Sequence, residues 1–204
     1  APHLTDGRTI CLACHQDMTS KTGVSICATG VEHTALAGAE TCVGCHMPVV
    51  PRASGSQGRK ASHRSHEFFG PHHLWKPGAP ETTFAASAVD LSHAWAADNL
   101  TVTLSNKTGH SFPSGFPGRQ AFVELEGTDA NGKAIWVPPS HGLLKRYVDA
   151  EGKPTLAPWA DRLEKDTRLK PGEVRPLSYT VPPAVTTVTV RLTLRLLPES
   201  LAAK

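Results

Sequence analysis

The sequence Cys-x-x-Cys-His occurs twice in this chain, at Cys11–His15 and at Cys42–His46. In such a segment the two thiols bond to one haem, and the histidine that follows lies beneath the porphyrin as the proximal ligand of the iron. A zinc site also uses CxxC pairs, but it does not need histidine directly after the second cysteine. The spacing therefore predicts two covalently attached c-type haems. The residues that would hold them are Cys11, Cys14, His15, Cys42, Cys45 and His46.

The fifth cysteine, Cys27, has no cysteine left to pair with once the two motifs are filled. We expect it to be a small buried apolar residue. Haem c is attached outside the cytoplasm, so we expect an exported protein, periplasmic or extracellular. The first residues, Ala1 to His3, lack the basic and apolar regions of a signal peptide, so we expect a mature end from which that peptide was removed.

The net charge of the chain and the length of its apolar runs limit the kinds of molecule that it is expected to bind. The formal net charge is +3, and the chain has no long run of lysine and arginine. We therefore expect no nucleic acid partner. No apolar run approaches the length of a membrane span, so we expect no transmembrane segment.

Apolar residues are distributed unevenly about residue 80. Residues 1–80 contain 14 Val, Ile, Leu, Phe or Trp, against 33 of the 124 residues in 81–204. The first segment also contains 8 of the 11 histidines and both motifs. Because this segment is too poor in apolar residues for an ordinary core, we expect short helices and loops wrapped around two haems.

The second segment alternates between apolar and polar residues, as strands with one buried face do. The alternation is clearest at residues 187–196, 100–105 and 123–126, and glycines in 129–132 and 149–152 suit hairpin turns. We expect an antiparallel β-sandwich in residues 81–204 that contributes a loop to the haem region. The fold class expected for the whole chain is α+β.

The second axial ligand of each iron decides between electron transfer and catalysis. Met18 and Met47 lie close to the proximal histidines, so neither easily reaches the far face of its own haem, although either could serve the other haem. Four histidines fall within eleven residues, and His110 lies in a turn-rich loop after a strand. The four are His63, His66, His72 and His73. The isolated histidines are expected to be ordinary residues; they are His3, His33, His93 and His141.

Three segments, in order, resemble the signature of a family of multihaem c-type cytochromes. They are residues 41–48 with CxxCHMP, 65–72 with SHxFxG, and 108–115 with a TGHxFP-type motif. Residues 27–33 and 166–173 also resemble stretches of that family, the latter in its C-terminal β region. The resemblance implies electron transfer outside the cytoplasm through bis-histidine haems, with His110 as a ligand. Relatives often carry four or more haems, whereas this chain has two motifs.

The first hypothesis is a dihaem electron carrier that passes single electrons between redox partner proteins, such as other cytochromes. The expected distal ligands are His66 and His110, then His73, with His63 and His72 also candidates. The second hypothesis is an enzyme with one open iron site that reduces peroxide or a nitrogen or sulfur oxyanion. The third is a repeating subunit of a multihaem assembly, which implies an oligomer. The chain has enough histidines to give each iron a second axial ligand, which favours the electron carrier.

Overall fold

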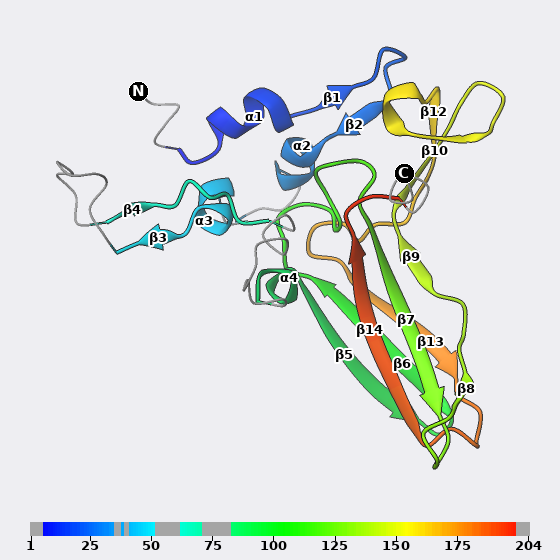
Figure 1. The fold of residues 1–204 in the computed structure, drawn as a ribbon. Coiled ribbons are helices and arrows are strands. Elements are labelled where there is room, and N and C mark those ends of the chain that lie inside the picture. Colours follow the sequence, from blue (N-terminus) through cyan, green and yellow to red (C-terminus); the bar gives the residue numbers. More distant parts are fainter. Residues whose placement is uncertain (1–5, 35–37, 39–40, 52–61, 71–82, 199–204) are drawn as a thin grey trace.

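The computed structural model describes residues 6–34, 38, 41–51, 62–70 and 83–198. Two sets of elements follow one another along the chain (Figure 1). The first set is α1 (Thr9–His15), β1 (Met18–Thr19), β2 (Ser25–Cys27), α2 (Thr29–Thr34), α3 (Cys42–His46), β3 (Val49–Val50) and β4 (His63–Arg64). The second set is α4 (Thr83–Ala88), β5 (Val89–Ala96), β6 (Asn99–Asn106), β7 (Gln120–Thr128), β8 (Ala134–Trp136), β9 (His141–Leu143), β10 (Lys145–Val148), β11 (Pro154–Thr155), the 3₁₀ helix η3 (Ala157–Trp159), β12 (Arg162–Asp166), β13 (Val174–Thr180) and β14 (Thr187–Arg195).

The long strands form two antiparallel sheets. One sheet has the order β13-β6-β5, and the other has the order β14-β7-β8, with β9 also paired to β7. Alternate residues of β6 and β7 are buried, which is why both sequences alternate. The buried residues of both sheets form one apolar cluster that includes Leu104 and Val123, each 0% exposed. The expectation of antiparallel strands is confirmed.

Tight turns connect neighbouring strands where the sequence predicted them. Gly132 and Gly152 have φ angles of 79° and 80°, in the left-handed region that glycine adopts without steric cost. In each turn the side chain of an aspartate accepts backbone N–H groups, two at Asp129 and one at Asp149. Glycine and aspartate together therefore fix these two turns.

The first set of elements contains few buried apolar side chains. Among the residues described before residue 71, Cys27 is the one hydrophobic residue that is buried. Part of this set packs against the second set, since Val24 and Ile26 contact a small cluster of Tyr147, Ala157 and Ala160. The short helices lie near one end of the long strands (Figure 1). The predicted boundary at residue 80, between domains 1–80 and 81–204, falls outside the described residues.

None of the described helices has both the length and the apolar character needed to cross a membrane.

Candidate functional site

Both CxxCH motifs form short helices. Residues three and four apart share one face of a helix, so each motif presents its two cysteines and its histidine on the same side. Asp6 begins the first helical turn by accepting the N–H groups of Arg8 and Thr9, each at 2.9 Å. Thr41 caps α3 by accepting the N–H of Gly44 at 3.2 Å. Hydrogen bonds to Asp6 and to Thr41 thus fix the start of each motif helix.

The two motifs lie beside one another. Burial raises the pKa of the Cys11 thiol, and the neighbouring Cys42 thiol raises it further through charge and a hydrogen bond. The backbone N–H of Val43 also donates to the carbonyl of Gly7 at 3.4 Å. The first cysteines of the two motifs, 31 positions apart in sequence, are therefore neighbours in space.

His46 is oriented by the chain that follows it. Its Nδ1 bonds to the carbonyl oxygen of Phe69, and because a carbonyl only accepts, Nδ1 carries the proton. The ring of Phe68 stacks on the imidazole, with 4.8 Å between centroids and an angle of 4°. This arrangement leaves Nε2 of His46 as the unprotonated nitrogen, which is the nitrogen available to a metal.

His110 shows the same pattern on the loop between β6 and β7. Its Nδ1 lies 2.9 Å from the carbonyl oxygen of Ser111, which again places the proton on Nδ1 and leaves Nε2 unprotonated. Burial lowers the pKa of His110, while the bond to Ser111 raises it. A histidine that binds a metal usually donates its other ring N–H to a group such as a backbone carbonyl, and the half-buried His110 has this arrangement.

The structure brings His46 and His110 together from two parts of the chain. Their ring centroids are 6.3 Å apart and their planes differ by 17°. Two imidazoles on opposite sides of one metal, with metal–nitrogen bonds of about 2 Å, have centroids roughly 6 Å apart. The donor set and spacing fit an iron held between them.

The remaining candidate residues differ in what surrounds them. Nδ1 of His15 lies 3.6 Å from Sγ of Cys27, so this motif histidine also has a neighbour at Nδ1. His63 lies on β4, opposite Val50, and His66 is exposed. His72 and His73 fall outside the described residues.

Sequence analysis did not single out three residues that the structure places near the site. His33 was expected to be ordinary, yet it is 8% exposed, and its charge lowers the pKa of His110. Glu32 and Arg168 form a largely buried ion pair of 2.7 Å, with side chains 12% and 10% exposed. Arg168 lies in the segment 166–173 that resembles the family's β region, but nothing in the sequence joins it to a residue 136 positions earlier.

Comparison with known proteins adds one structural relative. The chain is 26% identical to a penta-haem cytochrome c552 from Thermochromatium tepidum, with a TM-score of 0.80 over 99% of this chain. This chain is similar to a multihaem c-type cytochrome. The match supports covalently attached haem c, and the chain spans 51% of the length of that cytochrome. No protein-family model and no curated protein matches the chain.

Proposed function

We propose that this chain is a dihaem c-type cytochrome that transfers single electrons between redox partner proteins outside the cytoplasm. The observation that carries the proposal is the pairing of His46 with His110, 6.3 Å apart and nearly parallel. Each imidazole uses Nδ1 for a backbone carbonyl, which leaves Nε2 for a metal. Haem supplies one-electron redox chemistry, and an iron with two histidine ligands has no open position for a substrate.

The second haem would be held by Cys11, Cys14 and His15. Its distal ligand comes from the cluster of His63, His66, His72 and His73, and the buried position of His33 adds that residue to the set. The neighbouring thiols of Cys11 and Cys42 support two haems set close together, as electron transfer between them requires. The low apolar burial before residue 71 agrees with a segment whose core is largely porphyrin.

The partners that fit are other cytochromes, in the periplasm or outside the cell. A formal charge of +3 gives little reason for a nucleic acid partner. A second candidate is a role as one part of a larger multihaem assembly, because the chain matches about half of a penta-haem cytochrome. Native mass spectrometry separates a single dihaem chain from an oligomer.

Optical and electron paramagnetic resonance spectra of the ferric protein test directly whether the chain is an electron carrier. We expect two low-spin haems that do not bind carbon monoxide when reduced. A high-spin haem, together with turnover of peroxide, nitrite or a sulfur oxyanion, would instead identify a haem enzyme with one open site.

A further inference from the structure

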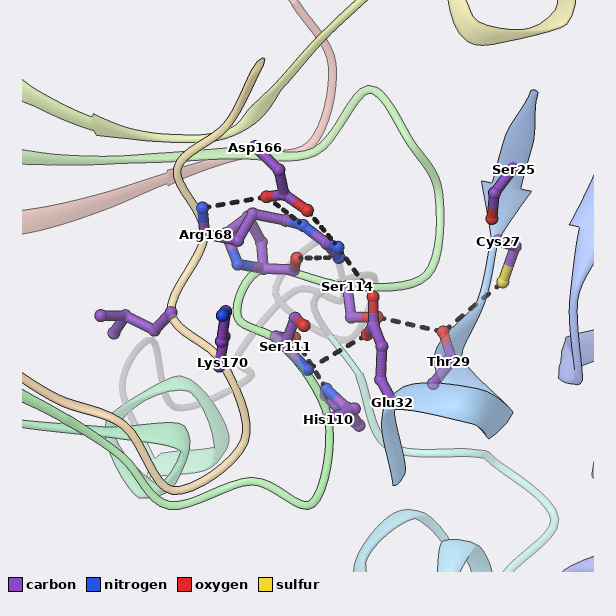
Figure 2. Close-up of polar contacts among 12 residues, drawn as sticks. Ser25, Cys27, Thr29, Glu32, His110, Ser111, Ser114, Asp166, Arg168 and Lys170 are labelled. Atoms are coloured by element: carbon purple, nitrogen blue, oxygen red, sulfur yellow. Dashed lines mark hydrogen bonds and ion pairs between the residues drawn. The ribbon is translucent and has the colours of Figure 1, made fainter. Parts of the chain in front are cut away.

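A partly buried polar cluster joins α2 to the loop that carries His110 (Figure 2). At its centre is the carboxylate of Glu32, whose side chain is 12% exposed. The carboxylate accepts the backbone N–H of Ser111 at 3.1 Å, the hydroxyl of Ser114 at 3.0 Å and the guanidinium of Arg168 at 2.7 Å. Three donors, one of them a cation, compensate the burial of this charge.

Arg168 is itself held in place from several sides. Its guanidinium also binds Asp166 at 2.8 and 3.0 Å and donates to the carbonyl of Pro113 at 3.3 Å. The side chain is 10% exposed. The cation that pairs with Glu32 is therefore fixed to the C-terminal β region, so Glu32 ties α2 to that region.

The contacts of Ser111 connect Glu32 to the imidazole of His110. The N–H that donates to Glu32 belongs to the peptide bond between His110 and Ser111. The carbonyl of Ser111 accepts the Nδ1–H of His110 at 2.9 Å. Glu32 thus restrains the short stretch of backbone that sets the direction of the His110 ring.

The same carboxylate ends a second chain of hydrogen bonds that begins at His15. Because the carboxylate only accepts, Ser114 donates to it and must accept from Thr29 at 3.0 Å. Thr29 then accepts from the thiol of Cys27 at 3.5 Å, and the sulfur accepts Nδ1–H of His15 at 3.6 Å. In this series of hydrogen bonds, each donor group therefore donates to the next residue on the way from His15 to Glu32.

We propose that Glu32 is a positioning residue shared by the two haem sites. One branch of its contacts orients the ring of His110. The other branch makes Nδ1 of His15 a hydrogen-bond donor to Cys27. This inference rests on the proposed function, in which both histidines bind iron. It assigns the carboxylate no contact with either cofactor. Its effect passes through Ser111 in one branch and through Ser114, Thr29 and Cys27 in the other.

The test uses the assembled holoprotein with Glu32→Gln and, as a matched control, Glu164→Gln. The control also converts a carboxylate to an amide and removes an ion pair, that of Arg146 and Glu164 at 3.6 Å on the surface. Loss of a hydrogen bond to a charged group shifts a local equilibrium about tenfold or more. We expect Glu32→Gln to raise, by about tenfold, the fraction of one reduced haem that binds carbon monoxide. Glu164→Gln should match the wild type.

Thr29→Val separates the two branches, since it breaks the chain to Cys27 and leaves the bond from Ser111 to Glu32. We expect no carbon monoxide binding in this variant, but a changed midpoint potential of the other haem. Wild-type spectra and potentials in Glu32→Gln would overturn the inference, and a wild-type potential in Thr29→Val would overturn its His15 branch. If Glu32→Gln fails to assemble, Ser114→Ala and Arg168→Gln each remove one of its donors, and wild-type spectra in both would overturn it equally.

The proposed function has a separate test. If His110→Ala leaves both haems low-spin, the ligand assignment fails. If His110→Ala opens one haem while Glu32→Gln does not, the carrier stands and only the role of Glu32 is lost.

Discussion

Sγ of Cys27 lies 3.6 Å from Nδ1 of His15, and the cysteine is 8% exposed. The sequence predicts a small buried residue at this position, and burial agrees with that prediction. With His15 as an iron ligand, as proposed, this contact would give the thiol a further role, because the partner of the second ring nitrogen sets the orientation and basicity of a ligating imidazole.

We expect Cys27→Ala to raise the midpoint potential of one haem, because loss of the acceptor makes His15 a weaker donor to ferric iron. Cys27→Ser keeps an acceptor and should leave haem content and potentials close to wild type. Spectroelectrochemical titration of the three proteins measures this. Identical potentials in the alanine variant and the wild type would reduce Cys27 to a packing residue.

Each CxxCH helix should carry one haem of its own. Denaturing mass spectrometry of the wild type is expected to show two haem additions that acid–acetone does not extract. The double variant Cys42→Ala/Cys45→Ala should show one addition, because α3 then lacks both attachment thiols. A single addition in the wild type, or zinc in place of haem, would be incompatible with two attachment sites.

The apolar cluster between the two sheets should determine the stability of the β region. Leu104 is 0% exposed, whereas Leu91, its cross-strand partner on β5, is 40% exposed. We expect Leu104→Ala to lower the free energy of unfolding by about 2–5 kcal/mol. Leu91→Ala should lower it by about 1 kcal/mol or less. Denaturant unfolding followed by circular dichroism compares them, and equal losses would contradict the burial difference.

His141 should make the folded protein less stable as pH falls. Burial lowers the pKa of this histidine, and the nearby charges of Arg175 and Lys165 lower it further. The unfolded chain, with an ordinary pKa of about 6.5, then binds more protons, so stability declines as pH drops below that value. The decline between about pH 7 and pH 5 should be shallower in His141→Gln. Parallel curves for the two proteins would show that His141 contributes nothing.

The spacing of residues predicts those structural features that depend on residues close together in the sequence. CxxCH places three groups on one helical turn, and alternation marks β6, β7 and β14. Contacts between distant residues carry no such periodic signal. The ion pair of Glu32 with Arg168 and the burial of His33 depend on how α2 meets the loops of the β region. The resemblance to the family implied that His110 is an iron ligand. That the imidazole of His46 lies beside it follows only from the structure.

The most direct test of the account is the carbon monoxide difference spectrum of reduced His110→Ala, measured beside the wild type. With 6.3 Å between the rings of His46 and His110, removal of one imidazole should open one iron. We expect one haem per chain to become high-spin or water-ligated when ferric and to bind carbon monoxide when reduced, while the other stays low-spin. Two low-spin haems that remain inert to carbon monoxide would show that His110 is not an iron ligand.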